Sequence, residues 1–97
     1  MYYILSGHEA VEVHGIVEWG RWFETADRVV KKDTVGDVEV STVFLGMDHS
    51  FGGRKPLLFE TMIFGGGYDQ SQWRYSTWGE AVAGHREAVL LVGKEPE

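Results

Sequence analysis

The stretch Leu57–Phe64 (LLFETMIF) decides the fold of this 97-residue chain. It is almost entirely apolar and has the length of one strand, which is typical of a strand covered on both faces. The segment Val38–Gly46 (VEVSTVFLG) is rich in β-branched and aromatic residues and predicts a second central strand. Gly36-Asp37 would join that strand to one expected over Arg28–Val35 as a hairpin. Together these segments predict an antiparallel sheet.

Further strands are expected at both ends of this central region. Tyr2–Leu5 and Ala10–Val13 have the composition and alternation of short strands on either side of a turn. Gln72–Ser76 (QWRYS) predicts another strand, after a glycine-rich loop over residues 65–71. The sequence therefore predicts a sheet of about five strands.

Two segments have the features of helices. Apolar residues recur at the i, i+3, i+4 and i+7 positions of EWGRWFETA, which predicts a short amphipathic helix near residues 18–26. Thr77 and Glu80 have the spacing of a capping box, which predicts a C-terminal helix near residues 78–92. An antiparallel sheet with a helix packed on one face is an α+β fold.

Length, composition and charge exclude several classes of protein. The chain has room for a single domain over residues 1–97. It contains no cysteine, which excludes disulfides, thiolate metal sites and cysteine nucleophiles. Its net charge of −6 argues against direct binding of nucleic acid, which needs clustered Lys and Arg. The chain lacks an apolar run of membrane-spanning length and a signal-peptide pattern, so we expect a cytoplasmic protein with no membrane partner.

Glu60 is the most informative polar residue, because it lies in the middle of the apolar stretch. A carboxylate in a covered region is costly unless it is paired or strongly hydrogen-bonded. Arg74 is its natural partner, since the glycine-rich loop would place the two strands side by side. Two interpretations stay open: a structural ion pair that fixes strand register, or a carboxylate in a ligand pocket that also includes Tyr75.

Asp48 and His49 open a second glycine-rich loop, over residues 47–56. A histidine beside a carboxylate can act as a general base, so His49 is a candidate catalytic residue together with Glu60. An Asx turn formed by Asp48 would explain the pair equally well. In the same loop Arg54 follows two glycines, an arrangement in which backbone amides and a base can converge on an anion.

Glu24 and Asp27, at the end of the short helix, complete the candidate binding residues. Glu24 and Arg28 would form an i,i+4 ion pair if that helix continued. The full set of candidates is Glu24, Asp27, Asp48, His49, Arg54, Glu60, Arg74 and Tyr75. The sequence contains no phosphate loop, nucleophile elbow or metal-ligand spacing of histidines, so we expect no cofactor and no metal ion.

Four segments resemble a family of small phage and prophage proteins: WFETADR (22–28), VSTVFLGMDHSFGG (40–53), LLFETMIFGG (57–66) and WRYSTWGEAVAGH (73–85). The resemblance covers roughly residues 19–90. The family has no assigned activity, so the resemblance implies a phage accessory role in the bacterial cytoplasm and identifies no catalytic residue. The chain departs from the family's pattern at Arg54-Lys55-Pro56, which stands where a proline-rich stretch is typical and suggests a separate specificity for this loop.

These observations predict a non-enzymatic phage-type accessory protein that binds a host protein or a small ligand. One alternative is a small acid/base enzyme, such as a hydrolase of a nucleotide-like substrate, with Glu60 or His49 as the base. Another is a nucleotide-sequestering protein that stacks a base on aromatic rings and holds phosphate with Arg54, Lys55 or Arg74. The high aromatic content and an exposed edge strand favour a homodimer.

Overall fold

Six strands and two helices form in the part of the chain that the computed structural model describes, residues 1–50, 52–53 and 55–94. In chain order they are β1 (Tyr2–Ser6), β2 (Glu9–Val13), α1 (Ile16–Thr25), β3 (Val29–Val35), β4 (Val38–Phe44), β5 (Phe59–Phe64), β6 (Gln72–Tyr75) and α2 (Trp78–Gly93). The α+β prediction is confirmed. The strands form two antiparallel sheets, β1-β2 and β3-β4-β5-β6, where the sequence predicted one sheet of about five strands. The reason is that β1 and β2 pair with each other, and β1 reaches the rest of the chain through a bridge between Tyr2 and Met47.

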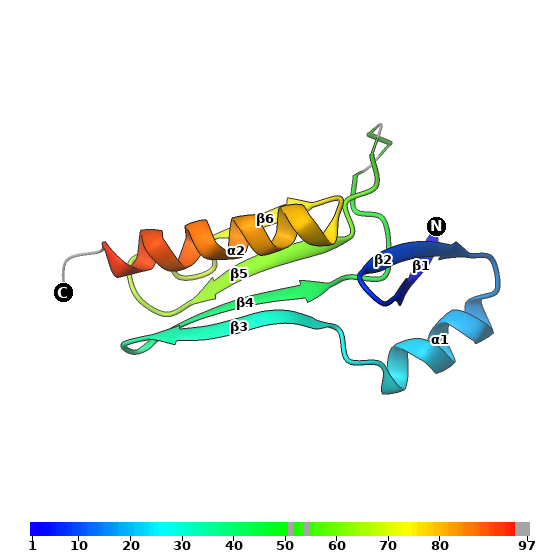
Figure 1. Ribbon diagram of the computed structural model, residues 1–97, viewed down its shortest axis with the longest axis horizontal. Helices are drawn as coiled ribbons and strands as arrows, with labels where there is room; N and C mark the ends of the chain where they lie inside the picture. Colours follow the sequence, from blue (N-terminus) through cyan, green and yellow to red (C-terminus); the bar gives the residue numbers. More distant parts are fainter. Residues whose placement is uncertain (51, 54, 95–97) are drawn as a thin grey trace.

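The four-stranded sheet is a meander in which each strand pairs with the next one along the chain. β3 and β4 are joined by a tight turn at Gly36-Asp37, where the glycine has a φ of 60°. That left-handed conformation is the one a two-residue hairpin turn needs, and glycine adopts it without strain. α2 lies along one face of the sheet, and the β1-β2 hairpin and α1 lie at one end of it (Figure 1).

The prediction that the strand over residues 57–64 is covered on both faces is wrong. In β5, Phe59, Thr61 and Ile63 are buried on the face that α2 covers. Glu60 is half-buried on the opposite face, and Phe64 on that face is 44% exposed. Among the described elements α2 is the one that packs over the sheet, and a single helix can cover only one face.

Both helices form close to their predicted positions. α1 begins at Ile16, two residues before the predicted range of 18–26, and α2 ends at Gly93. The capping box of α2 is confirmed, because Thr77 Oγ1 accepts the Glu80 amide at 3.1 Å and the Glu80 carboxylate accepts the Thr77 amide at 3.1 Å. Both hydrogen bonds satisfy donors at the helix start and thereby fix where α2 begins.

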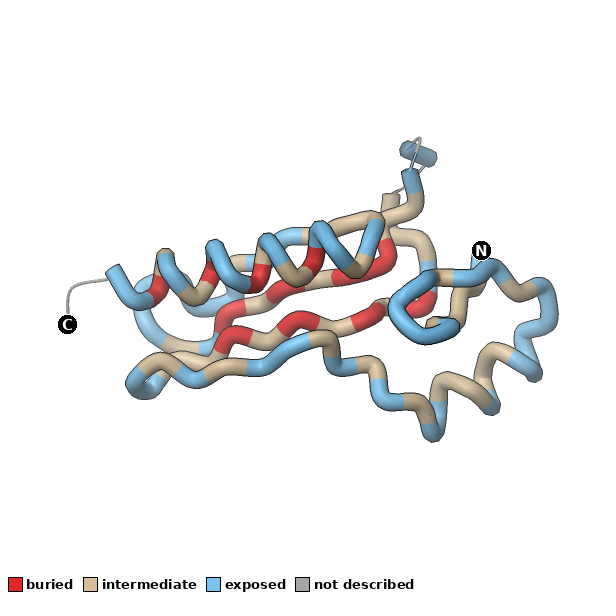
Figure 2. Tube along the Cα trace, viewed as in Figure 1, coloured by how far each residue is buried: buried red, intermediate tan, exposed pale blue. Residues whose placement is uncertain are grey.

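The buried residues lie between α2 and the sheet, on the inner side of the helix and on the central strands (Figure 2). They form two apolar parts separated by a polar one. The first apolar part contains the buried residues Val40, Ile63, Ala88 and Val92. The second contains the buried residues Phe44, Leu58, Phe59 and Ala81. The buried polar residues are Thr42, Thr61 and His85. In each of β4, β5 and α2 the polar residue lies between the positions that contribute to the two apolar parts.

The β1-β2 hairpin is held against α1 and the sheet by Trp19. Its indole N–H donates to the carbonyl oxygens of Tyr3, at 3.1 Å, and Gly46, at 3.0 Å. Gly46 has a φ of 78°, and a Cβ there would approach the Phe23 ring to 3.0 Å. A glycine is therefore required at this position both by its backbone conformation and by the closeness of α1.

Candidate functional site

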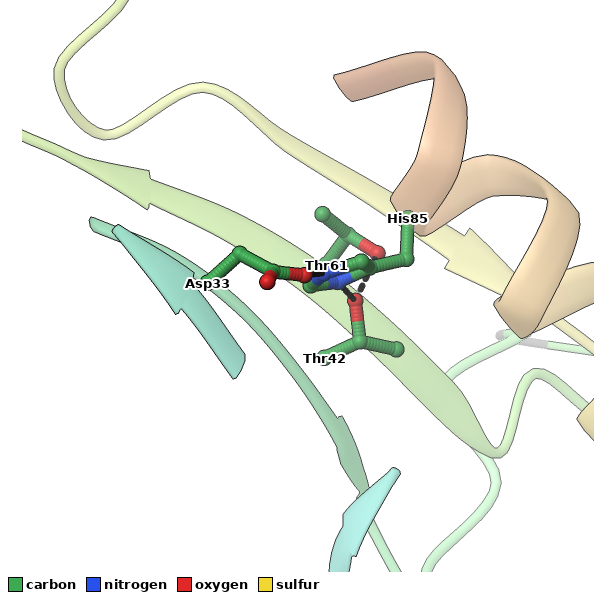
Figure 3. Close-up of polar contacts among 4 residues, drawn as sticks. All are labelled: Asp33, Thr42, Thr61 and His85. Carbon is green, nitrogen blue, oxygen red and sulfur yellow. Dashed lines mark hydrogen bonds and ion pairs between the residues drawn. The ribbon is translucent and has the colours of Figure 1, made fainter. Parts of the chain in front are cut away.

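A chain of polar side chains crosses the core between the two apolar parts (Figure 3). His85 of α2 contacts Asp33 of β3, Nε2 to Oδ2 at 2.8 Å, and Thr42 of β4, Nδ1 to Oγ1 at 2.7 Å. Thr42 is in turn hydrogen-bonded to Thr61 of β5. Both threonines are fully buried and His85 is 3% exposed, whereas the Asp33 side chain is 41% exposed. This row of hydrogen-bonded side chains, called the polar chain below, thus connects the carboxylate of Asp33 at the surface with the threonine hydroxyl groups in the core.

The donor and acceptor roles in this chain are mutually consistent. A carboxylate oxygen only accepts, so Nε2 of His85 carries a hydrogen atom and donates to Asp33. The Thr42 hydroxyl group can donate one hydrogen bond and accept another, so it can serve His85 and Thr61 at the same time. Each of these buried side chains has a hydrogen-bond partner, which is the condition under which polar groups are tolerated in a core.

Tyr75 of β6 lies beside Thr61, the last residue of the polar chain. Burial raises the pKa of the Tyr75 phenol; the neighbouring Thr61 hydroxyl group opposes that shift, and the negative charge of Glu87 adds to it. On the helix side Tyr75 packs against Gly84, where a Cβ would overlap the tyrosine hydroxyl. Tyr75 is therefore held in position from the sheet by Thr61 and from α2 by Gly84.

A cavity of about 280 Å³ lies beside Tyr75, between β6 and α2, and opens to solvent. Two aromatic residues of β6 and four residues of one α2 face line it: Trp73, Tyr75, Gly84, Glu87, Ala88 and Leu91. The Trp73 side chain contributes an accessible ring surface, since the residue is 39% exposed. The cavity, called the β6–α2 pocket below, thus combines two aromatic rings, aliphatic side chains and one carboxylate.

The ion pair that the sequence predicted between Glu60 and Arg74 is confirmed. The two residues face each other across β5 and β6, with Arg74 Nε 2.9 Å from Glu60 Oε2. The pair lies on the sheet face opposite α2, whereas Tyr75, the next residue of β6, lies on the α2 face. The structure does not bring Tyr75 together with Glu60 and Arg74, because successive residues of a strand point to opposite faces.

Asp48 and His49 organise the loop between β4 and β5. Asp48 Oδ1 accepts the amides of Ser50, at 2.8 Å, and Leu57, at 3.0 Å. The nearby Ser50 side chain, and the Ser50 and Leu57 amides that hydrogen-bond to the carboxylate, lower the pKa of the Asp48 carboxyl. His49 Nδ1 lies 2.8 Å from the Met47 carbonyl oxygen. Both side chains therefore serve the loop itself, and Arg54, also predicted here, lies outside the described residues.

Glu24 belongs to α1 and Asp27 to the connection from α1 to β3, and neither lines the β6–α2 pocket. Asp27 accepts the Val29 amide at 3.1 Å, as in an Asx turn. The expected Glu24–Arg28 ion pair does not form, because α1 ends at Thr25. The Arg28 guanidinium lies instead 3.8 Å from the centroid of the Phe23 ring.

A second concavity, of about 620 Å³, lies between the β1-β2 hairpin and the start of α2. The His8 and Trp78 rings stack in it with centroids 3.9 Å apart and planes 4° from parallel. This concavity is wider and more open to solvent than the β6–α2 pocket. In this stack the His8 and Trp78 rings each cover one face of the other.

The described part of the chain was also compared with the requirements of a metal site and of a membrane-spanning helix, and it meets neither. No three histidine, aspartate or glutamate side chains there are grouped so that they could hold a metal ion. None of its helices combines the length and apolar character that crossing a membrane requires.

Comparison with protein-family models, curated proteins and solved structures found no match.

Sequence reasoning missed the polar chain and the β6–α2 pocket. A signal for the first existed: His85 falls in the apolar stripe of α2, and a buried imidazole needs polar partners. Thr42 and Thr61 occupy inward positions of two strands and could supply them. No sequence pattern indicates the pocket in the same way, because its shape depends on how β6, with Trp73, packs beside α2, with Gly84.

Proposed function

We propose that this protein is a non-enzymatic binding protein that holds a small ligand in the β6–α2 pocket. One observation carries the proposal: an open cavity of about 280 Å³ with Trp73 and Tyr75 as its aromatic walls. Small-molecule sites are concave, lined by aromatic and apolar side chains, and carry a few polar groups that orient the ligand. The β6–α2 pocket has each of these properties, with Glu87 and the Tyr75 hydroxyl as its polar groups.

Accessibility favours binding over acid/base catalysis. Asp33, His85 and Thr42 follow the acid–base–nucleophile order of a hydrolytic triad, but Thr42 is 0% exposed and a substrate cannot reach its hydroxyl. Glu60 is paired with Arg74, and His49 is hydrogen-bonded within its loop. The groups that a general base mechanism would use are therefore engaged in contacts within the protein.

The size of the pocket favours a small ligand over a host protein. Stable protein–protein interfaces bury about 800 Å² on each partner, far more than six pocket-lining residues supply. The resemblance to phage and prophage proteins supports an accessory role in the bacterial cytoplasm, in which the protein would take up a host small molecule.

The proposal is tested by native mass spectrometry of the intact chain after incubation with a bacterial metabolite extract. A Leu91→Trp variant fills the pocket from its rim, and Leu90→Trp is the matched control because Leu90 is 56% exposed beside it. We expect a small-molecule adduct on the wild type and on Leu90→Trp that is lost in Leu91→Trp. No adduct on the wild type, or equal adducts on all three proteins, would overturn the proposal.

A further inference from the structure

We propose that the ligand of the β6–α2 pocket is a small organic ammonium ion. This inference rests on the proposed function and adds the chemical class of the ligand. It follows from the polar groups at the pocket, from its aromatic walls and from its size.

The one charged group that lines the pocket is a hydrogen-bond acceptor. Glu87 is the one charged residue among the described residues that line it, and its carboxylate only accepts. The Tyr75 hydroxyl group can accept as well as donate, and the Trp73 indole N–H is a donor. No cationic side chain lines the pocket among the described residues, so an anion would find no opposite charge there.

Among the described residues Glu87 has no ion-pair partner. The described ion pairs join Lys32 to Glu39, Arg74 to Glu60 and His85 to Asp33, and none of them involves Glu87. Its charge acts within the pocket, since it contributes to the raised pKa of Tyr75, which lines the same cavity. The net charge of −6 adds a negative potential around the whole chain, which attracts cations and repels anions.

The aromatic walls suit a cation as well as an apolar group. The faces of Trp and Tyr rings carry negative charge density and attract an ammonium ion within about 6 Å of the ring centroid. The same contact already occurs within this protein, where the Arg28 guanidinium lies 3.8 Å from the centroid of the Phe23 ring. Trp73 and Tyr75 offer two such rings on one side of the pocket, and Glu87 a carboxylate from the other.

The size of the pocket restricts the ligand further. Its volume of about 280 Å³ lies just below the roughly 300–1,000 Å³ of most small-molecule sites. The aliphatic side chains of Ala88 and Leu91 suit the methyl or methylene groups that surround an ammonium nitrogen. A compact alkylammonium ion satisfies the acceptors, the rings and the aliphatic side chains together.

The test compares two probes of the same shape by NMR on the intact protein. Choline carries a quaternary ammonium group, and its neutral carbon isostere has a carbon in place of the nitrogen. Shifts of the Trp73 indole N–H and the Gly84 amide report on the pocket, and the Trp19 indole N–H serves as a distant reference. We expect choline to shift both pocket signals in a saturable way and the isostere to bind at least about two-fold more weakly, the smallest effect of a cation–π contact at an exposed site.

Two substitutions, together with one control, separate the contributions of the Glu87 charge and of the Trp73 ring to choline binding. Glu87→Gln keeps the shape of the side chain and removes its charge, and we expect about two- to five-fold weaker binding, as for exposed ion pairs. Glu12→Gln on β2 makes the same change in net charge away from the pocket and should leave the affinity within about 1.5-fold of the wild type. Trp73→Leu should weaken binding at least about three-fold.

The outcomes distinguish this inference from the proposed function. If the isostere binds as tightly as choline, or if Glu87→Gln and Glu12→Gln have equal effects, the ligand class is wrong while a binding pocket remains. If choline shifts neither pocket signal but the mass-spectrometric adduct is lost in Leu91→Trp, the protein binds a ligand of another class. If both experiments fail, the proposed function falls with the inference.

Discussion

Gly84 shows how a single residue can shape both the core and the candidate site. A glycine in the interior of a helix normally costs about 1 kcal/mol of stability relative to alanine. Here the missing side chain makes room for Tyr75, whose hydroxyl group also lies beside Thr61 of the polar chain. Glycine at this position therefore lowers the helix propensity of α2 but allows a close contact between α2 and β6, beside the β6–α2 pocket.

The first prediction concerns Gly84→Ala. The added methyl group overlaps the Tyr75 ring, so we expect the free energy of unfolding to fall by about 1–3 kcal/mol, although alanine is the better helix former. Gly79→Ala is the matched control in the same helix, since a Cβ there meets no atom within 4 Å. Urea denaturation measures both. A Gly84→Ala variant as stable as the wild type would show that Tyr75 does not fill this space.

The second prediction concerns the hydrogen bond between Thr42 and Thr61. Replacing either threonine by valine keeps the shape and leaves the other hydroxyl short of a partner in the core, at a cost of about 1–3 kcal/mol. The double variant removes both hydroxyls, so its cost should be smaller than the sum of the single ones by about 1 kcal/mol. Denaturation of the three variants measures this coupling. Strict additivity would contradict a direct contact between the two side chains.

The residues of the polar chain explain why the site was harder to predict than the strands that carry it. His85 lies 43 positions from Thr42 and 52 from Asp33 in sequence, so no local pattern marks them as partners. Glu60 and Arg74 were predictable, because they lie on consecutive strands joined by one loop and face each other by register. The alternation pattern of a strand does not predict contacts that depend on how α2 packs over the sheet.

At the scale of elements, short-range sequence patterns were sufficient to predict where a helix or strand forms and which of the two it is. The β-branched and aromatic composition of β4, the Gly36-Asp37 turn and the capping box of α2 each depend on neighbouring residues, and each element formed as predicted. The division into two sheets was not predictable in this way. It depends on β1 and β2 pairing with each other and docking on α1 through Trp19, contacts that link distant segments.

The third prediction concerns the loop between β4 and β5. Because the pKa of Asp48 is lowered from its ordinary value of 3.8, its ionised form stabilises the fold above that pH. The contribution is lost as the pH falls through the lower pKa of the folded state. Asp48→Asn should therefore reduce stability at pH 7 and have a progressively smaller effect below pH 3.8. Thermal unfolding as a function of pH measures it, and a pH-independent difference would exclude the charge as the cause.

At the scale of the whole molecule, the sheet has one covered and one open face. The molecule is elongated, about 47 × 29 × 20 Å, because the β1-β2 hairpin and α1 extend one end of the four-stranded sheet (Figure 1). α2 covers one face and shapes the β6–α2 pocket at its edge. The other face carries the Glu60–Arg74 pair and the exposed Phe64 ring.

The fourth prediction is the homodimer that the aromatic content and edge strands favour. The open sheet face supports it, since Phe64 is 44% exposed there and would gain from being covered. We expect sedimentation equilibrium to give a dimer whose dissociation constant rises in Phe64→Lys. A wild type that sediments as a monomer at all concentrations contradicts this prediction, and it leaves the β6–α2 pocket on the opposite face unaffected.

The central claim is that the β6–α2 pocket, and not another aromatic cluster of the molecule, receives the ligand. The most direct measurement is the set of nuclear Overhauser effects between the methyl protons of choline and the aromatic protons of the intact chain. The account predicts effects to the rings of Trp73 and Tyr75. Effects confined to Trp78 and His8 at the second concavity, or to Trp19 beside α1, would contradict it.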